Sequence, residues 1–268
     1  DLKKYFVQFI NNVPSFGKSF ICIDDEVNQT LIKKIKNRNF YTYGLNSKSN
    51  FYIKNIRQNI RHSVFDLMIN LPNKKKINIT NIKIPLIGLH NIRNSVAAVA
   101  VSLTIGISIH NIKKGLFNFK GVQRRFNKIF TFNKIDFFDD YAHHPTEIKN
   151  VLDGVDKVYK GFEKVCIFQP HRISRVKDLK KEFSSAFKKA DTVVLCPIYT
   201  AGEKMKLGFS YLNFAREIIK NSKVNLFLVD DLKQLSKFLK KNMYGKKIVI
   251  GMGAGSITNW MRELPSLM

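Results

Sequence analysis

Two rhythms of apolar and polar residues divide the chain near residue 131. Before that point, the apolar spacing typical of helices occurs in four segments: residues 2–12, 25–36, 88–106 and 109–117. Short apolar or alternating runs, typical of strands, occupy others: residues 19–23, 40–43, 51–53, 63–69 and 77–84. The first part is therefore predicted to begin with alternating helices and strands. It should continue as a small antiparallel patch over residues 50–84 and end with two helices.

A more regular alternation of strands and helices fills the second half of the chain. A strand predicted at residues 122–133 leads into further strands: residues 135–139, 164–168, 192–196, 225–229 and 247–250. Amphipathic helical segments follow them: residues 145–159, 176–190, 211–220, 232–241 and a last one from about residue 256. This alternation indicates βαβ units and a mainly parallel sheet. We predict an α/β protein with domains 1–130 and 131–268, whose ligands bind where the parallel strands end.

The composition supports a folded chain with a sizeable core. Of its 268 residues 44% are hydrophobic, and no apolar run reaches the roughly 20 residues of a membrane-spanning helix. The first residues, DLKKYFVQFINNVP, lack the long apolar run and the cleavage site of a signal peptide. Cys22, Cys166 and Cys196 are far apart and show no metal-ligand spacing. These features predict a cytoplasmic protein with reduced thiols and no membrane insertion.

The formal net charge of +26 has two interpretations. One is nucleic-acid binding through contacts with phosphates. The other is a general enrichment in Lys, which is spread along the chain together with Asn and Ile. No separate basic tail and no aromatic RNA-binding motif accompanies the lysines. We therefore predict no nucleic-acid partner and keep a noncatalytic basic binding module as the alternative class of function.

The first motif with chemical potential is GLHNIRN at residues 88–94. His90 and Asn94 lie four positions apart, so they share one face of the predicted helix. Asn91 falls in or near the first helical turn. An Asn side chain both donates and accepts hydrogen bonds, which suits the edge of a base. The alternative is a helix cap at Asn91 with a merely polar Asn94.

Paired arginines form the second motif, GVQRRF at residues 121–126. Guanidinium groups bind phosphate through two parallel hydrogen bonds, so Arg124 and Arg125 are candidates for a phosphate site. They also fit an exposed strand of an unusually basic chain. The motif alone does not separate these two possibilities.

The third motif is DDYAHHPTE at residues 139–147, where a strand ends and a helix begins. A carboxylate at that place, such as Asp140, accepts hydrogen bonds from ribose hydroxyls. His143 and His144 beside the two acids also raise the possibility of a metal site, but all four groups are local in sequence. Thr146 and Glu147 fit the start of a helix equally well.

The fourth motif, FQPHRISR at residues 168–175, again follows a strand. Arg172 and Arg175 lie three positions apart, so one helical turn would point both guanidinium groups in the same direction. Two such groups suit a carboxylate, and His171 adds a donor. Cations at a helix start are disfavoured by the helix dipole, by up to about 1 kcal/mol. Their presence there suggests an anionic ligand, although exposed helix charges remain the alternative.

Two further turns follow predicted strands: IYTAGE at residues 198–203 and GMGAGS at residues 251–256. Closely spaced glycines before a helix allow the backbone to approach a ligand. The second turn does not fit the dinucleotide-binding fingerprint, so it is weak evidence alone.

In this order and at these spacings, the motifs resemble those of the Mur ligases. The resemblance spans nearly the whole chain, from VQFINNVPSFG through GLHNIRNSVAAVAV, GVQRRF, DDYAHHPTEI, FQPHRISR and IYTAGE to GMGAGSI. Within the family it is strongest to the members that join L-alanine to UDP-N-acetylmuramate. It implies the later part of a central ATP-binding domain at residues 1–130. It also implies a Rossmann-like, amino-acid-binding C-terminal domain at residues 131–268.

The resemblance further implies roles for individual residues. Near the adenine of ATP it places three: His90, Asn91 and Asn94. It places Arg125 or its neighbour Arg124 at the phosphates of ATP, and Asp140 at the ribose. In the alanine pocket it places Tyr141, His171, Arg172 and Arg175. Near the reacting centre it places His143 and His144.

The implied reaction transfers the γ-phosphate of ATP to the muramyl carboxylate, and L-alanine then attacks the acyl phosphate. The family's Gly-Lys-Thr phosphate loop, its UDP-binding domain and the upstream Glu and His that hold Mg²⁺ are absent from this sequence. We therefore expect a fragment that has no ligase activity alone, with no metal ligands of its own.

The nearest rival within the family is the ligase that attaches a recycled murein tripeptide to the same sugar nucleotide. It shares the DDYAHHPT block. A tripeptide requires a different pocket where FQPHRISR stands, so the HRxxR spacing favours the alanine enzyme.

Overall fold

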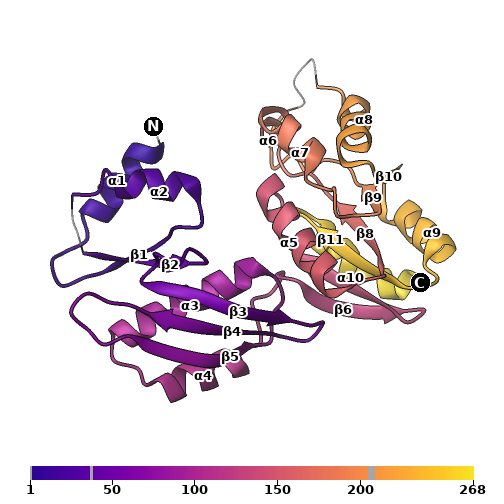
Figure 1. Cartoon of the computed structure of the whole chain (residues 1–268). Helices are drawn as coiled ribbons and strands as arrows, with labels where there is room; N and C mark the ends of the chain where they lie inside the picture. Colours follow the sequence, from indigo (N-terminus) through magenta and orange to yellow (C-terminus); the bar gives the residue numbers. More distant parts are fainter. Residues whose placement is uncertain (1, 37–38, 205–208) are drawn as a thin grey trace. The chain divides into compact units, whose positions relative to one another are not determined.

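The computed structural model describes residues 2–36, 39–204 and 209–268. The chain forms two compact units, Asp1–Lys120 (unit 1) and Gly121–Met268 (unit 2), drawn in Figure 1. The domain boundary predicted after residue 130 falls inside β6 (Asn127–Phe132), which pairs along the sheet of unit 2.

Unit 1 combines a mixed sheet with four helices in its described part. The strands, in sheet order, are β1 (Ser19–Cys22), β2 (Phe40–Gly44), β3 (Phe51–Gln58), β4 (Ser63–Ile69) and β5 (Ile77–Ile84). The helices are α1 (Leu2–Asn11), α2 (Glu26–Ile32), α3 (Leu89–Thr104) and α4 (Ile109–Asn118). β1, β2 and β3 run parallel, whereas β3, β4 and β5 are antiparallel. The predicted antiparallel patch is thus continuous with the first two strands.

Apolar residues of α3 and α4 cover one face of this sheet and form its core. Ile92 and Val96 of α3 are completely buried against Phe65 and Leu67 of β4. The start of α2 is capped by Asp25, whose carboxylate accepts a hydrogen bond of 3.0 Å from the Asn28 N–H. α2 ends at Ile32, earlier than predicted.

Unit 2 has a mainly parallel sheet, as predicted. Its strands, in sheet order, are β10 (Asn225–Leu228), β9 (Thr192–Leu195), β8 (Glu163–Phe168), β11 (Lys247–Met252), β7 (Ile135–Asp140) and β6 (Asn127–Phe132). Its helices are α5 (Pro145–Val158), α6 (Ile173–Asp178), α7 (Lys180–Ser185), α8 (Tyr211–Ser222), α9 (Leu232–Asn242) and α10 (Ile257–Leu267). Only β6 pairs in the antiparallel direction among these described strands.

Helices cover both faces of this sheet, which gives unit 2 three layers (Figure 1). On one face, Leu235 of α9 and Met261 of α10 pack on Val249 in the middle of the sheet. On the other face, the ring of Phe168 at the end of β8 contacts the rings of Phe183 and Phe187. The inner strands β9, β8, β11 and β7 are therefore mostly buried on both sides, which explains their continuous apolar runs.

Two predicted elements of unit 2 were wrong in extent. The strand predicted from residue 122 begins at Asn127, because Arg124 and Phe126 adopt left-handed backbone conformations. The single helix predicted over residues 176–190 is two short helices, α6 and α7. They meet at Leu179, whose φ of −112° and ψ of 25° interrupt the α-helical geometry.

The strand registers bring the ends of the parallel strands to one edge of the sheet. Asp140 of β7 lies opposite Met252 of β11, and Met252 lies opposite Phe168 of β8. Phe168 in turn lies opposite Leu195 of β9. The motifs that follow these strands in the sequence are therefore neighbours in space.

Among the described helices, none combines the length and the apolar character that a membrane span requires. All three cysteines are free, and burial raises the pKa of the Cys166 and Cys196 thiols.

Candidate functional site

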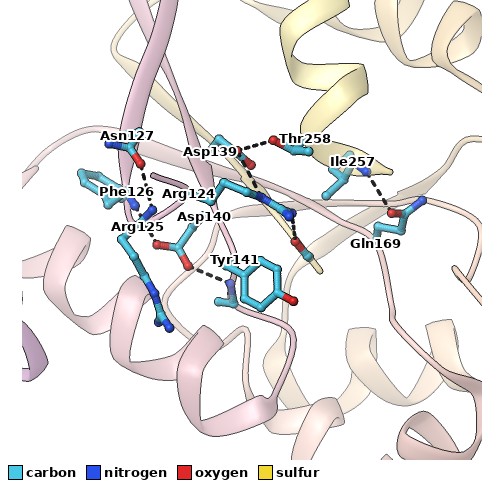
Figure 2. A network of polar contacts seen from close by, with 12 residues as sticks. Arg124, Arg125, Phe126, Asn127, Asp139, Asp140, Tyr141, Gln169, Ile257 and Thr258 are labelled. Carbon is cyan, nitrogen blue, oxygen red and sulfur yellow. Dashed lines mark hydrogen bonds and ion pairs between the residues drawn. The ribbon is translucent and has the colours of Figure 1, made fainter. Parts of the chain in front are cut away.

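β7 ends in two buried carboxylates that have different partners. Asp139 accepts a hydrogen bond of 2.5 Å from the Thr258 hydroxyl of α10. Asp140 accepts two backbone N–H groups, those of Phe126 and Ala142, at 2.8 Å each (Figure 2). Burial raises the pKa of Asp140 to about 6, and the two N–H bonds offset only part of this effect. Asp140 is thus an acceptor that titrates close to neutral pH, with lone pairs left for a ligand hydroxyl.

The loop before β6 carries the paired arginines in a left-handed backbone. Arg124 has a φ of 58° and Phe126 a φ of 54°, conformations that cost roughly 1–2 kcal/mol in a non-glycine residue. The Phe126 ring stacks on Phe138 of β7, with centroids 4.2 Å apart and planes 11° apart. Together with the Phe126–Asp140 hydrogen bond, this stack holds the loop against the end of β7.

The two arginines of this loop have different surroundings. The Arg124 guanidinium donates to the Gly253 carbonyl at 2.7 Å, lies 3.7 Å from Asp139 and covers the Tyr141 ring at 4.6 Å. The Arg125 side chain is exposed, and its charge lowers the pKa of Asp140. The guanidinium of Arg125 is therefore available at the surface, whereas that of Arg124 is directed into the protein (Figure 2).

An aromatic cluster follows β7 and β8. The Tyr141 and His143 rings meet edge to face with centroids 5.1 Å apart, and His143 lies 5.8 Å from His171. His171 stacks on Tyr199, with centroids 5.4 Å apart and planes 13° apart. The cluster brings together Tyr141, His143 and His171, which the sequence assigned to one site from two separate motifs.

His144 has a local structural role. It is the N-cap residue of α5. The His144 Nδ1 accepts the Thr146 N–H at 3.4 Å, and the His144 N–H donates to the Glu147 carboxylate at 3.1 Å. Such a capping box satisfies two N–H groups that the helix leaves unpaired. The helix-start interpretation of Thr146 and Glu147 is therefore correct, since both lie in the first turn of α5, and the cap itself is His144, for which no such role was predicted. A catalytic role of His144 stays a prediction, for which only Nε2 remains available.

Arg172 has an unusual backbone at the start of α6. Its φ of 67° is rare for a non-glycine residue, and the residue is the N-cap and not part of the first turn. Its N–H donates to the Tyr199 carbonyl at 2.9 Å, and the Tyr199 N–H donates to the Pro170 carbonyl at 2.8 Å. Backbone strain of this kind persists only where the surroundings enforce it, and it clusters at functional sites.

Arg172, Arg175 and His171 form a cationic group at the end of β8. Arg175 Nη1 lies 3.4 Å from His171 Nδ1, a distance and a pairing that suit a guanidinium donor and a neutral imidazole acceptor. Burial lowers the pKa of His171, and the charges of Arg175, His143 and Arg172 add to this effect. The group therefore offers two permanent positive charges and one neutral imidazole, which fits recognition of a carboxylate.

Glu203, in the IYTAGE block, supports this group and was not singled out in the sequence. Its carboxylate accepts the Ser174 N–H at 2.9 Å and the Ser174 hydroxyl at 2.6 Å. The pKa of Glu203 is lowered by these bonds to Ser174 and, less strongly, by Arg172. Glu203 thus caps α6 from a neighbouring loop and holds Ser174 two positions after the strained Arg172. The signal that would have revealed it is a carboxylate four residues after Tyr199.

Replacing Glu203 with alanine should lower the affinity of this cationic group for an amino-acid carboxylate by roughly fivefold, the effect of one lost helix cap. The reason is that Ser174 loses its two hydrogen bonds to Glu203, so the start of α6 that carries Arg172 is held less firmly. Titration of both proteins with L-alanine measures the change, and Glu182→Ala, which removes an exposed carboxylate from α7, is the matched control. Equal affinities of Glu203→Ala and the wild type would contradict this role.

The glycine-rich turn after β11 is filled by the protein itself. A Cβ atom on Gly255 would lie 2.5 Å from Tyr199 and 2.6 Å from Gln169, and one on Gly253 would lie 2.7 Å from the Gln169 carbonyl. Gln169 is buried, and its side-chain oxygen accepts the Ile257 N–H at 2.9 Å at the start of α10. The glycines therefore permit close packing of three strand ends. Gln169 and Tyr199 stand inside the predicted motifs, but neither was assigned a role there.

The remaining predicted residues, His90, Asn91 and Asn94, lie on the first turns of α3 in unit 1. The Asn91 amide donates to the Ile87 carbonyl at 2.7 Å, and Asn94 is exposed. The interpretation of Asn91 as the helix cap was wrong, because Gly88 is the N-cap of α3 and no side chain caps it. Each unit thus holds its own group of predicted residues.

A partly buried ion pair beside this group was not predicted from the sequence. Arg93 Nε donates to Asp24 Oδ2 at 2.6 Å, and Asp24 Oδ1 accepts the Leu45 N–H at 2.7 Å. A Cβ atom on Gly44 would lie 2.4 Å from the same carboxylate. Asp24 therefore connects the ends of β1 and β2 with α3, and only glycine fits at position 44.

Metal-binding geometry is not evident in the described part of the chain. Among residues 2–36, 39–204 and 209–268, no three His, Cys, Asp or Glu side chains gather as a metal site would require. The two aspartates and two histidines of residues 139–144 are separated by the contacts described above.

Comparison with known proteins identifies the family. The sequence pattern described as "Mur ligase middle domain" matches residues 1–102, and that described as "Mur ligase, glutamate ligase domain" matches residues 124–255. The chain belongs to the Mur ligase family. The two matches cover most of unit 1 and of unit 2, so both halves of this Mur ligase chain have a counterpart in the family.

Individual relatives narrow the resemblance. This Mur ligase chain is 67% identical, over all 268 residues, to a UDP-N-acetylmuramate–L-alanine ligase of Pelagibacter ubique, and it is 36% identical over 261 residues to one of Bartonella tribocorum. It spans 58% and 55% of the length of these two proteins. Among solved structures it is similar to the UDP-N-acetylmuramate–alanine ligase of Thermotoga maritima. The TM-score is 0.70 at 24% identity, over 92% of this chain and 50% of that one.

Proposed function

We propose that this chain is part of a UDP-N-acetylmuramate–L-alanine ligase and that its unit 2 binds L-alanine. The observation that carries the proposal is the group formed by Arg172, Arg175 and His171 at the end of β8. Two guanidinium groups beside a neutral imidazole fit the carboxylate of a small amino acid. The curated relatives named above support alanine as that amino acid.

The proposed reaction has two chemical steps. A carboxylate oxygen of UDP-N-acetylmuramate attacks the γ-phosphorus of ATP, which forms an acyl phosphate and releases ADP. The neutral amine of L-alanine then attacks the acyl carbon, phosphate leaves with the C–O bond electrons, and the amine loses a proton as the amide forms. Positioning and charge stabilisation supply most of the catalysis in such transfers. The substrates and partners of the whole enzyme are thus UDP-N-acetylmuramate, L-alanine and ATP.

Within this proposal each residue group has a task. Asp140 accepts hydrogen bonds from the ribose hydroxyls, and Arg125 contacts the ATP phosphates. Tyr141 lines the alanine pocket, and His143 lies beside it near the reacting amine. In unit 1, the adenine is assigned to His90, Asn91 and Asn94. The edge-to-face contacts from Tyr141 through His143 to His171 support a single pocket in unit 2.

Mg²⁺ enters the proposal as the companion of ATP, because a divalent cation neutralises the phosphate charge in phosphoryl transfer. The described residues of this chain do not form a cluster that fits it, so no step is assigned to a metal held by them. A cytoplasmic location belongs to the proposal, since ATP and the sugar nucleotide are cytoplasmic substrates.

A chimeric ligase tests the function. In it, this chain replaces the matching 268 residues of the Pelagibacter ubique ligase, to which it aligns over its full length. We expect ADP formation that requires both UDP-N-acetylmuramate and L-alanine. A folded chimera that stays inactive, while the Pelagibacter ligase turns over in the same assay, would contradict the proposal. Activity with a murein tripeptide but not with L-alanine would favour the recycling ligase instead.

A further inference from the structure

Tyr141 is held by Arg124 in two ways. The Tyr141 N–H donates to the Arg124 carbonyl at 2.7 Å, and the Arg124 guanidinium lies over the Tyr141 ring, 4.6 Å from its centroid. The edge of the His143 ring contacts the same tyrosine. Tyr141 is 36% exposed, so its ring can change rotamer toward the side that faces solvent. Arg124 and His143 are therefore the contacts that define where the ring lies.

Arg124 is itself held by residues at the ends of β7 and β11. Its Nη2 donates to the Gly253 carbonyl at 2.7 Å, and its Nε lies 3.7 Å from the Asp139 carboxylate. Asp139 is 1% exposed and accepts a hydrogen bond from the Thr258 hydroxyl. A line of contacts thus runs from α10 through Asp139 and Arg124 to the Tyr141 ring (Figure 2).

This anchoring separates the two arginines that the sequence could not distinguish. Arg124 Nη2 donates to the Gly253 carbonyl, its Nε lies 3.7 Å from the Asp139 carboxylate, and its flat face is occupied by Tyr141. Arg125, one residue later, is exposed beside Asp140. A phosphate group bound through Nε and Nη2 of Arg124 would compete with the buried Asp139 carboxylate and with the Gly253 carbonyl. No such rearrangement is needed at Arg125.

We infer that Arg124 is a positioning residue that fixes Tyr141 in the alanine pocket, and that Arg125 alone of the pair contacts phosphate. The inference rests on the proposed alanine-ligase function. Its physical basis is preorganisation: a ring that already occupies its bound position loses less conformational freedom when the amino acid arrives. Arg124 thereby connects the loop that carries Arg125 to the pocket for the amino acid.

The matched variants Arg124→Met and Arg125→Met of the chimeric ligase test the inference. Arg124→Met should raise the KM for L-alanine about tenfold, as expected for a lost cation–π contact and a freed ring, and leave the KM for ATP nearly unchanged. Arg125→Met should do the reverse. Arg124→Lys keeps a cation above the ring and should recover part of the alanine affinity. A larger change in the ATP KM than in the alanine KM for Arg124→Met would overturn the inference.

Loss of Arg124 leaves the buried Asp139 without its cation, so the single variant is at risk of misfolding. The double variant Arg124→Met/Asp139→Asn removes both charges and keeps an oxygen acceptor for Thr258. It should reproduce the tenfold rise in alanine KM in a stable protein. An alanine KM equal to that of the wild type would overturn the inference.

A measurement on the 268-residue chain itself separates this inference from the proposed function. In the NMR spectrum, the Tyr141 ring should show one defined environment in the wild type and an averaged one in the double variant. An unchanged Tyr141 ring would overturn the positioning role even if the chimera is an active ligase. A changed ring would support it even if the chimera is inactive and the proposed function fails.

Discussion

Arg172→Ala should raise the KM of the chimeric ligase for L-alanine about a hundredfold or more, with little change in the KM for ATP. Arg172 is exposed in the free chain, and the bound amino acid would cover its guanidinium. Removing one partner of a charge pair that binding buries costs about 2–5 kcal/mol, and most of this energy appears as faster dissociation. Arg175 remains, so binding is weakened and not abolished. Steady-state kinetics with each substrate varied in turn measures both constants. The matched control is Lys177→Ala, which removes an exposed cation from the same helix.

The backbone of Arg172 allows a second, independent comparison. Its φ of 67° costs roughly 1–3 kcal/mol in any residue with a Cβ, but little in glycine. Arg172→Gly should therefore unfold at a higher denaturant concentration than Arg172→Ala, although both lose the same guanidinium and the same alanine affinity. If Arg172→Gly were the less stable of the two, the strain argument would be wrong. If both kept the wild-type alanine KM, the assignment of the pocket would be wrong.

The order of the elements was predictable because both units follow strong local patterns. The buried parallel strands of unit 2 read as apolar runs, and their helices have amphipathic spacing, so their positions agree with the prediction to within a few residues. The errors occur where tertiary contacts override local preference. The segment before Asn127 has the alternation of a strand. The Phe126 stack on Phe138 and the hydrogen bond to Asp140 hold it in a left-handed loop instead.

The candidate site was predictable as a list of motifs but not as a geometry. Since parallel strands end at one edge of a sheet, the residues after β7, β8 and β11 were expected to be neighbours. Which of two adjacent residues performs a task was not predictable, because the sequence shows the same side chain twice. Arg124 and Arg125 differ only in direction, and Asp139 and Asp140 alternate between the two faces of β7.

Supporting residues were the least predictable part. Glu203 and Gln169 act by hydrogen bonds to backbone N–H groups of distant helix starts, at Ser174 and Ile257. Nothing in the local sequence indicates which helix start a side chain will reach. The glycine-rich turn was misleading for a related reason. Glycines permit close approach of any group, and here the approaching groups are Tyr199 and Gln169 and not a ligand.

The free energy of unfolding of Asp140→Asn should rise relative to that of the wild type as the pH increases from 4 to 7, by up to about 3 kcal/mol. The pKa of Asp140 is raised from 3.8 to about 6 in the folded protein, mainly by burial. The folded state then holds a proton that the unfolded state releases, so wild-type stability falls as the pH rises from about 4 through about 6. The asparagine variant lacks this titration. Denaturant unfolding of both proteins across this range gives the difference directly.

The strand itself provides the control for this measurement. Asp136 lies four residues earlier on β7, and its side chain is 37% exposed. Asp136→Asn is compared with the wild type in the same way, as a variant that removes one carboxylate from the same strand at an exposed position. The net charge of +26 affects wild type and variants nearly equally, so it cancels in the comparison. Parallel stability curves for Asp140→Asn and the wild type would show that burial does not strain this carboxylate.

The same titration should appear in function if the proposed role holds, because an ionised Asp140 would be the form that accepts the ribose hydroxyls. In the chimeric ligase the KM for ATP should rise as the pH falls below about 6, since the protonated carboxyl offers fewer acceptor sites. Asp140→Asn should raise the ATP KM at neutral pH by roughly tenfold, and its KM should not change further on acidification. A variant that binds ATP like the wild type but is more stable would assign Asp140 to strain alone. If the stability and the KM for ATP both change near pH 6, the same ionisation of Asp140 that destabilises the fold is the one that strengthens nucleotide binding.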